Sequence, residues 1–340
     1  MLTDLSQRDL GTTVFGRRIE LPVMLGPAGM HRLVAREGEV ATARAARTAG
    51  TVFALSASSN RTIEEVAAAA PGAHLWFQLY LWDSRAWSEH LVRRAAAAGY
   101  EVLCVTVDTK APGARKYRDL RNGLLDPRVY ARSALDAVRR PRWVANFLLG
   151  PRIRGVHLPS DGGKPAEVSL FKSPSVIARR MDPSATWDEI RWLRGIWQGP
   201  LVVKGVLTAE DATLAFEQGA DGVICSNHGG RVLDGVAASL DALPRVVEAA
   251  ARARKEVFID GGIRTGGDVV KAIALGARAC LIGRPYWWGL AVGGEHGAAR
   301  VLEILRAEID GALLRLGRRT IADLDRSVIE RLPFLLPAAR

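Results

Sequence analysis

Eight short apolar runs, each followed by a segment with helical periodicity, are the feature that most constrains the fold of this chain. The runs are rich in β-branched residues and apolar on both faces, as strands of a buried parallel sheet are. They cover residues 22–29, 51–56, 75–81, 102–109, 201–206, 222–228, 257–262 and 279–285. Eight strand–helix units predict an α/β fold, a (β/α)8 barrel of the TIM type, in one domain over residues 1–340.

The segments between these runs show the spacing of amphipathic helices. We expect helices over 37–49, 63–70, 84–98, 186–197, 209–218, 240–253 and 267–275, and a long one from about residue 298. Four of them end at a glycine directly before the next strand, which is a usual helix stop. A doubly wound open sheet is the alternative, but the first strand is not followed by the GxGxxG fingerprint of that fold.

One connection is much longer than the others, because residues 110–185 lie between the fourth strand and the next helix. A loop of that length in a compact domain is usually a lid or an insertion, and we expect 110–185 to be one. Its middle, 127–155, combines seven arginines with Tyr130, Trp143 and Phe147. Two interpretations stay open: a lid with its arginines in water, or a peripheral contact with a membrane surface.

Net charge, cysteine spacing and the lack of long apolar stretches exclude several classes of protein. The net charge is +11, but the basic residues are spread along the chain and no nucleic-acid-binding motif accompanies them, so we predict no nucleic-acid partner. The three cysteines, Cys104, Cys225 and Cys280, lie in apolar runs without CxxC spacing, which predicts buried thiols and no metal site. The first residues lack an apolar signal core, and no stretch is apolar enough to span a membrane, so we expect a cytoplasmic protein.

Polar side chains gather where the expected strands end, while the strand bodies are apolar. In a (β/α)8 barrel the active site lies at the carboxyl ends of the strands. The residues in question are Gln78, Tyr80, Thr106, Asp108, Lys204, Ser226, His228, Asp260, Arg264 and Arg284. This distribution predicts an active site at that edge of the barrel.

Among these residues His228 is the candidate base, since an unperturbed imidazole takes up a proton near neutral pH. It closes the sixth strand and is followed by two glycines and Arg231. Asp108 is the candidate partner that would stabilise the imidazolium. Arg115 and Arg231 are candidates for binding a substrate carboxylate, because a guanidinium bonds both carboxylate oxygens.

The ends of the last two strands read DGGIRTGGD and IGRP, and we interpret them as a phosphate site. Gly262 and Gly283 allow backbone amides to approach a phosphate closely. Arg264 and Arg284 supply positive charge, and we expect the N-terminus of the helix that begins near residue 267 to contribute as well. A phosphate site after strands seven and eight recurs in these barrels.

The motifs WFQLY, VTVDT, LVVKGV, SNHGGRVLDG, DGGIRTGGDVVKAIALGA and IGRP resemble those of the FMN-dependent 2-hydroxy acid oxidases and dehydrogenases. This family includes glycolate oxidase, lactate oxidase, lactate dehydrogenase and mandelate dehydrogenase. The resemblance runs from about Asp4 to the C-terminus. It implies FMN as cofactor, oxidation of an L-2-hydroxy acid to a 2-keto acid, O2 or quinone as electron acceptor, and a homo-oligomer, tetramers being common among relatives.

The resemblance also implies residue roles. His228 would take the substrate proton with the support of Asp108, Arg115 and Arg231 would hold the substrate carboxylate, and Tyr80 would hydrogen-bond the substrate oxygen. A cation near flavin N1 favours the reduced, anionic ring, and the resemblance gives Lys204 that role. The other residues that it assigns to the cofactor are Ala28, Gly29, Ser56, Gln78, Thr106, Ser226, Asp260, Gly262, Arg264, Gly283 and Arg284.

Several stretches look closest to bacterial L-lactate dehydrogenase, a relative that docks on membranes and passes electrons to quinone. Gly29 stands where many oxidases of the family carry alanine, which suggests altered oxygen access, and Ala28 replaces a common hydroxyl residue. Family members usually have a further upstream segment with a tyrosine that binds the substrate carboxylate. The start at Met1 predicts either a truncation or a more open pocket. Two alternatives stay open: a biosynthetic enzyme acting on an aryl-hydroxyacetate or a modified peptide, and a barrel that binds FMN without catalysis.

Overall fold

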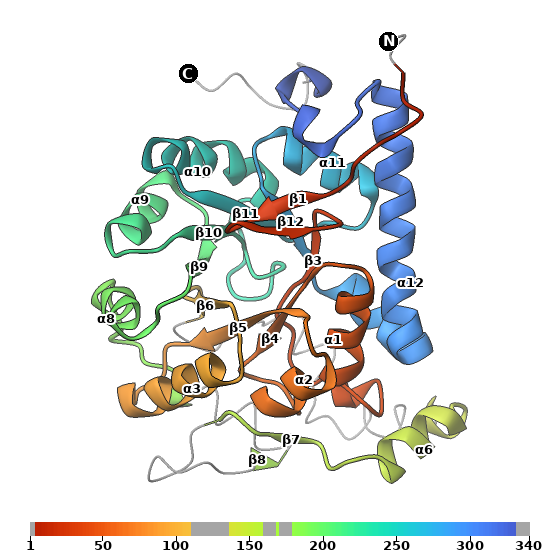
Figure 1. Ribbon diagram of the computed structural model, residues 1–340. Coiled ribbons are helices and arrows are strands. Elements are labelled where there is room, and N and C mark those ends of the chain that lie inside the picture. Colours follow the sequence, from red (N-terminus) through yellow and green to blue (C-terminus); the bar gives the residue numbers. More distant parts are fainter. Residues whose placement is uncertain (1–3, 110–135, 159–167, 170–178, 331–340) are drawn as a thin grey trace.

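The computed structural model describes residues 4–109, 136–158, 168–169 and 179–330 of the chain. At its centre eight parallel strands form a closed barrel surrounded by helices (Figure 1). In barrel order the strands are β3 (Val23–Leu25), β4 (Val52–Ser56), β5 (His74–Tyr80), β6 (Val102–Thr106), β9 (Leu201–Val206), β10 (Gly222–Cys225), β11 (Glu256–Asp260) and β12 (Ala279–Ile282). Parallel pairing of β12 with β3 closes the sheet. The predicted (β/α)8 barrel is confirmed, and the open sheet is wrong.

Seven of the expected helices begin and end within two residues of the predicted bounds. They are α1 (Glu39–Thr48), α2 (Ile63–Ala69), α3 (Arg85–Ala97), α8 (Asp188–Ile196), α9 (Ala209–Glu217), α10 (Ser239–Ala253) and α11 (Gly266–Ala274). Side-chain caps fix several starts: the Thr62, Thr208 and Thr265 side chains each accept a backbone N–H of the first turn. The agreement follows because the local signals and the barrel packing favour the same bounds.

The last helix differs from the prediction. α12 (Arg284–Leu316) begins directly after β12 rather than near residue 298. Gly293 and Gly294 interrupt its helical dihedrals, with φ values of −141° and 57°, so that two helical pieces meet at a kink. This glycine pair hides the first piece from a search for continuous helical periodicity.

A two-stranded hairpin near the N-terminus was not predicted. β1 (Thr12–Val14) pairs antiparallel with β2 (Arg17–Ile19), and the hairpin lies across the barrel in Figure 1. Val14 and Ile19 pack against the barrel-interior residues Trp76 and Phe258. The hairpin therefore covers the amino-terminal end of the barrel. Its strands have three residues each, too short for a clear pattern.

Side chains alternate along each strand between the barrel interior and the layer beneath the helices, as pleated strands require. On β5, Trp76 packs with the interior cluster and Phe77 with the cluster under the helices. Two residues beyond each interior position, the same alternation puts a polar side chain at the carboxyl end of the strand. These residues are Ser56, Gln78, Thr106, Lys204, Ser226 and Asp260. The barrel is thus apolar inside up to one polar layer at the carboxyl ends of the strands.

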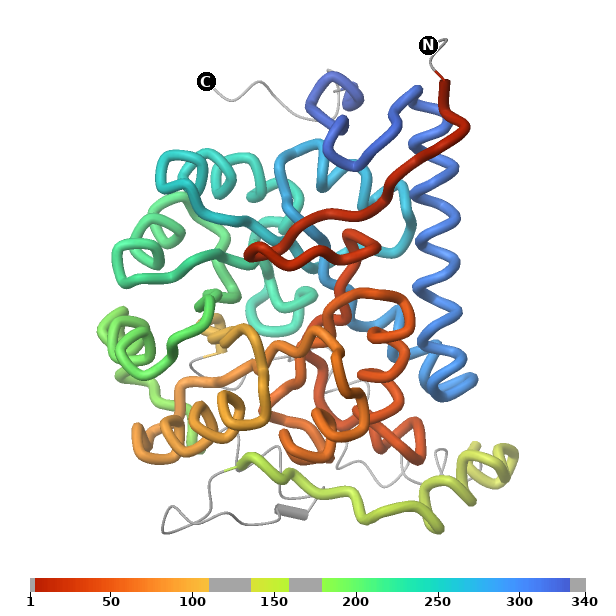
Figure 2. The backbone as a smooth tube through the Cα atoms, viewed as in Figure 1, coloured from red at the N-terminus to blue at the C-terminus, as the bar shows by residue number. Residues whose placement is uncertain are grey.

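The long connection after β6 is described only in part. It includes helix α6 (Pro141–Leu149) and the short strands β7 (Arg154–Gly155) and β8 (Val168–Ser169). Figure 2 shows α6, in yellow-green, at the periphery of the molecule, and none of its residues is buried. Within the described ranges no helix is long and apolar enough to cross a membrane.

The three cysteines are free and buried, as predicted. Burial raises the pKa of the Cys104 and Cys225 thiols to about 12, and it also raises that of Cys280. All three therefore stay protonated at neutral pH and act as small apolar side chains.

We predict that Phe258→Ala destabilises the barrel by about 3–5 kcal/mol, because the change leaves a cavity among Trp76, Phe15 and the interior strands. Urea denaturation followed by circular dichroism measures the free energy of unfolding. The exposed Leu214→Ala, on α9, is the control and should change this free energy by less than about 0.5 kcal/mol. Equal effects of the two variants would contradict the packing described for the barrel interior.

Candidate active site

The polar layer at the carboxyl ends of the strands is centred on Lys204, which is 3% exposed. Its Nζ lies 3.0 Å from Asp260 Oδ2 and donates to Ser226 Oγ over 3.0 Å. Burial by itself lowers the pKa of this ammonium, but the charges of Asp260 and Asp108 and the hydrogen bond to Asp260 raise it above its ordinary value. Lys204 is therefore a permanent buried cation that joins three strands.

His228 and Asp108 come together as the sequence predicted. His228 Nδ1 lies 2.9 Å from Asp108 Oδ1, although the two residues are 120 positions apart. The His228 backbone N–H donates to Ser226 Oγ over 3.0 Å, and its φ of 55° is left-handed. This contact commits Nδ1 to Asp108 and leaves Nε2 as the ring nitrogen for a substrate. The unusual backbone conformation is typical of a functional position.

Two further residues support this pair, and the sequence analysis missed both. Gly205 is a β-bulge: Lys204 pairs with Ile224 and Val206 with Cys225, which leaves Gly205 unpaired. Its φ is 109°, and a Cβ there would lie 2.7 Å from Asp108 Cβ and Cγ. Asn227 holds the histidine loop, because its Oδ1 accepts the Gly230 N–H over 3.2 Å. The KG pair in LVVKGV was a signal for the bulge.

Tyr80 lies close enough to Lys204, Asp108 and Arg231 for their charges to act on its hydroxyl. Burial raises the pKa of the Tyr80 phenol; the charge of Asp108 raises it too, while those of Lys204 and Arg231 lower it. The hydroxyl therefore stays protonated and can donate to a substrate oxygen. Arg231 is exposed on the loop that carries His228. Arg115, the other predicted carboxylate ligand, lies outside the described residues.

The residues that were predicted to contact the flavin from the first strands lie on neighbouring strands of the barrel and on the loops after them. Gln78 Oε1 accepts from Ser56 Oγ over 3.0 Å and from the Ala57 N–H over 3.3 Å. Gly29, next to Ala28, packs so closely on the loop after β4 that a Cβ there would lie 2.7 Å from Ser58 Cβ. Thr106 pairs with both Tyr80 and Lys204 in the barrel register.

The predicted phosphate region is brought together in part. Arg284 Nη2 donates to the Gly229 carbonyl over 2.9 Å, which ties the start of α12 to the histidine loop. α12 begins at Arg284 with Gly283 as its N-cap residue, and no side-chain hydrogen bond caps this end of the helix. Gly262 has a φ of 82°, and Arg264 is exposed beside it. Asp260, in contrast, pairs with Lys204 rather than facing this region.

The expected contribution of the α11 N-terminus is wrong. Asp268 Oδ2 accepts the N–H groups of Arg264 and Thr265, and Thr265 Oγ1 accepts that of Asp268. The Gly266 N–H donates to Glu308 Oε2. These N–H groups are already bonded within the chain, whereas no side-chain hydrogen bond caps the start of α12.

The polar layer fits an FMN ring on an observation independent of any relative. Gln78 Nε2 and Asp260 Oδ1 are buried and have no hydrogen-bond partner in the described part of the chain. Buried polar atoms are nearly always bonded, and a flavin ring presents N–H, C=O and ring-nitrogen groups that can bond both. Gln78 and Lys204 are thus the residues that would hold the ring, with Arg284 available to its phosphate.

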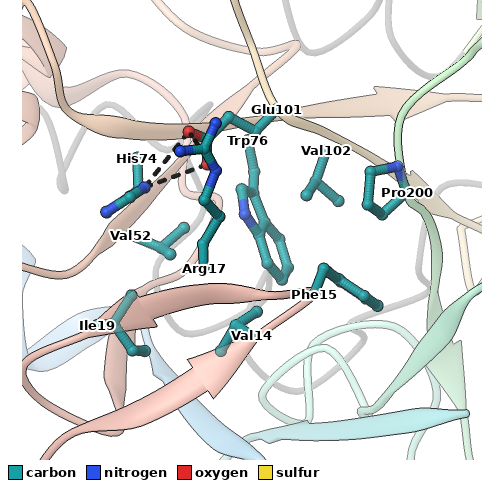
Figure 3. A pocket seen from close by; sticks show the side chains of 10 residues that line it. All are labelled: Val14, Phe15, Arg17, Ile19, Val52, His74, Trp76, Glu101, Val102 and Pro200. Atoms are coloured by element: carbon teal, nitrogen blue, oxygen red, sulfur yellow. Dashed lines mark hydrogen bonds and ion pairs between the residues drawn. The ribbon is translucent and has the colours of Figure 1, made fainter.

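A separate cavity of about 230 Å³ lies at the opposite end of the barrel, under the hairpin (Figure 3). Its walls include Trp76 and Phe15, and its charged groups already pair with one another. His74 Nδ1 is 3.2 Å from Glu101 Oε2, and Arg17 Nε is 3.8 Å from Glu101 Oε1. Because barrel strands present their chemistry at the other edge, we do not take this cavity as the active site.

The sequence matches the family model described as FMN-dependent dehydrogenase over residues 1–331. The chain belongs to this family. It is 42% identical over 334 residues to the L-lactate oxidase of Nostoc sp., covering 97% of this chain and 85% of the relative. It is also 42% identical over 335 residues to the L-lactate dehydrogenase of Caulobacter vibrioides, covering 98% and 86%.

Solved structures of this family are similar throughout. A crystal structure of the monotopic membrane protein (S)-mandelate dehydrogenase superposes with a TM-score of 0.88 at 38% identity, covering 97% of this chain and 86% of that one. A mandelate oxidase structure gives a TM-score of 0.78 at 37% identity, covering 96% and 83%. The protein is accordingly an FMN-dependent oxidoreductase of the 2-hydroxy acid class, and the predicted cofactor and reaction class are confirmed.

We predict that Gly205→Ala lowers kcat by about tenfold to a hundredfold, because the new Cβ displaces Asp108 from His228 and small misplacements in an active site are costly. Gly195→Ala, in α8 with open space around it, is the matched control and should leave kcat unchanged. Steady-state kinetics with a 2-hydroxy acid measure both. A fully active Gly205→Ala enzyme would show that the bulge does not position Asp108.

Proposed function

We propose that this enzyme oxidises an L-2-hydroxy acid to the 2-keto acid with His228 as the base. The observation that carries the proposal is the 2.9 Å contact between His228 Nδ1 and Asp108 Oδ1, beside the buried cation Lys204. Asp108 Oδ2 is buried without a partner among the described residues. An imidazole held by a carboxylate can accept a proton, because the carboxylate stabilises the imidazolium that forms.

In this reaction the substrate loses two hydrogens and two electrons as its C–OH becomes C=O. His228 Nε2 takes one of the hydrogens as a proton. FMN, when bound, would supply the acceptor for the electron pair together with the other hydrogen, and the positive charge of Lys204 would favour the negative charge of the reduced ring. Arg231 would bind the substrate carboxylate together with Arg115, and the Tyr80 hydroxyl would donate to the substrate oxygen.

Two substrates have support among the relatives. The similar sequences include an L-lactate oxidase and an L-lactate dehydrogenase, and the similar structures include (S)-mandelate dehydrogenase. Both acids carry the same reacting group and carboxylate and differ in their side chain. A panel of both enantiomers of lactate and mandelate therefore tests the reaction and its substrate together.

We predict that one L-acid bleaches the flavin band near about 450 nm under anaerobic conditions, and that His228→Ala retains FMN but loses turnover by about 10²–10⁴-fold. Absorption spectra give cofactor content, and stopped-flow gives the rate of bleaching. His90→Ala, on a peripheral helix, is the control and should bleach at the wild-type rate. A His228→Ala enzyme that bleaches normally would remove the base assignment, and a wild-type protein that no acid bleaches would favour a barrel that binds FMN without catalysis.

We also propose that helix α6 and its flanks contact an anionic membrane surface. Val138, Leu148 and Leu149 are 78%, 70% and 76% exposed, and residues 136–158 contain five arginines and one aspartate. Apolar side chains beside basic ones are typical of segments that lie in a membrane interface. The description of the similar (S)-mandelate dehydrogenase as a monotopic membrane protein supports this proposal.

Membrane contact bears on the electron acceptor. A protein held at a membrane surface has access to lipid-soluble quinones, so we propose a quinone as the acceptor, with O2 as the alternative. Re-admission of O2 to the bleached enzyme distinguishes them. Fast recovery of the flavin colour would favour an oxidase and contradict the quinone proposal.

We predict that the wild-type protein binds phosphatidylglycerol vesicles more tightly than phosphatidylcholine vesicles, because each arginine near an anionic surface contributes about 1 kcal/mol. The double variant Leu148→Asp with Leu149→Asp should weaken binding at least about tenfold, since it puts charge on the apolar side of α6. Val292→Asp, at an equally exposed site on α12, is the control. Vesicle co-sedimentation measures all three, and equal binding of the double variant and the control would contradict the proposal.

A further inference from the structure

The loop that follows β3 lies between the edge of the barrel and the peripheral segment that contains α6. The resemblance assigns Ala28 and Gly29 in this loop to the flavin, and the N–H of the next residue, Met30, donates to the Ser58 carbonyl over 3.2 Å. Arg32 lies only two residues further along. Its side chain extends in the opposite sense, toward the peripheral segment that contains α6.

Arg32 is almost completely buried, with 2% of its surface exposed, and its guanidinium bonds three backbone carbonyls of that segment. Nε donates to Pro151 O over 2.9 Å, and Nη2 donates to Asn146 O over 2.8 Å and to Phe147 O over 3.2 Å. Asn146 and Phe147 lie in the last turn of α6. The carbonyls there have no partners within the helix, so Arg32 acts as a C-terminal cap supplied by a distant part of the chain.

The positive charge of Arg32 is costly to bury unless other groups compensate it. Within the described ranges no acidic side chain pairs with it; burial lowers its pKa, as do the charges of Arg61 and Arg36. The negative end of the α6 dipole and three carbonyl oxygens are therefore what compensates the buried cation. If α6 moved away, Arg32 would be left buried without partners, and the loop that carries it would have to rearrange.

Two other hydrogen bonds connect the same parts. Trp143 Nε1, on α6, donates to the Leu33 carbonyl over 2.9 Å. Asn60, in the loop after β4, accepts the Arg32 N–H over 3.3 Å and donates to the Arg154 carbonyl over 2.9 Å. α6 and the segment after it are thus bonded directly to the loops that follow β3 and β4.

Glu39, on α1, bonds the backbone on both sides of these contacts. Its carboxylate is completely buried, and Oε1 accepts the His31 N–H over 3.2 Å and the Asn60 N–H over 3.0 Å. The segment around Arg32 is consequently fixed at one end to α1 and at the other to α6. Residues 31–34 and Asn60 are among the connections through which a displacement of α6 and the segment after it would reach the barrel edge.

We propose that Arg32 is a positioning residue that makes the placement of the loop after β3 depend on the placement of α6. The inference rests on the proposed function in two respects, namely that this loop faces the flavin and that α6 contacts a membrane. Its consequence is that contact of α6 with a lipid surface is transmitted to the flavin edge of the barrel mainly through the buried guanidinium of Arg32.

Hydrogen–deuterium exchange of the FMN-loaded protein tests the inference without relying on turnover. We expect Arg32→Ala to raise amide exchange about tenfold both in residues 26–34 and in α6. Arg32→Lys should restore part of the protection, because an ammonium can bond carbonyls but lacks the planar fork. Arg36→Ala removes a charge from an exposed position in the same loop and should leave both regions unchanged. Increased exchange in α6 alone would show that Arg32 caps the helix without positioning the loop, and would overturn the inference.

A second measurement adds vesicles of phosphatidylglycerol. In the wild-type protein we expect vesicle binding to change exchange in residues 26–34 and to shift the visible spectrum of the flavin. In Arg32→Ala the vesicles should still bind but leave both signals unchanged. Gly150→Ala gives an independent variant that keeps the arginine, because a Cβ there would collide with the Arg32 guanidinium, and it should behave like Arg32→Ala.

The outcomes separate this inference from the proposed function. If the wild-type protein is bleached by a 2-hydroxy acid and binds vesicles, but exchange in residues 26–34 is the same with and without vesicles, only the coupling through Arg32 is overturned. If the protein is never bleached and yet the two regions respond together to Arg32→Ala, the positioning role stands and the proposed chemistry fails.

Discussion

Parallel pairing between the last strand and the first is the constraint on which the rest of this structure depends. When β12 pairs with β3, eight strands share one interior, and residues distant in sequence lie at the same level along the barrel axis. The alternation of side chains then directs one polar residue per strand into a common layer. Lys204, Ser226 and Asp260 come from the neighbouring strands β9, β10 and β11, and the curvature of the closed sheet directs their side chains toward one another. The buried cation therefore depends on strand pairing and curvature, and so does the histidine that is supported from the same strand ends.

Much of this arrangement follows from the sequence, because its signals are local and the barrel rules are strong. Apolar runs, helical spacing and terminal glycines predicted every barrel strand and nearly every helix, and the polar strand ends predicted His228 with Asp108. The failures have physical reasons. The β1–β2 hairpin is too short for a periodic pattern, and the Gly293–Gly294 kink conceals the first part of α12. The KG pair signalled a bulge at Gly205, but its importance lies in a contact with Asp108 from another strand, which the sequence does not show. The α11 N-terminus looked free until Asp268 and Glu308 were seen to bond its amides.

The strand ends and the loops that follow them have different tasks in this chain. The barrel itself fixes Lys204, Tyr80 and Asp108, to which we assign parts of the reaction, on strands or directly after them. The peripheral segment around α6 is connected to the barrel through backbone carbonyls and a few buried polar side chains, chiefly Arg32 and Asn60. In the proposed function, strand ends therefore position the reacting groups, while the peripheral loops provide the membrane contact. Because the barrel strands and the loops are separate parts, related barrels can keep one reaction while their loops differ.

The hairpin and the strand that closes the barrel also have a consequence for synthesis of the chain. Phe15 bonds through its backbone to Glu256, Arg8 pairs with Asp310, and β3 requires β12. At about 5–20 residues per second, translation takes on the order of tens of seconds between making these N-terminal segments and making their partners. For that interval β3 has no partner on one edge, and an unpaired apolar edge is prone to pair with another chain. The ribosome-bound form, rather than the finished enzyme, is the state of this protein that most needs protection from aggregation.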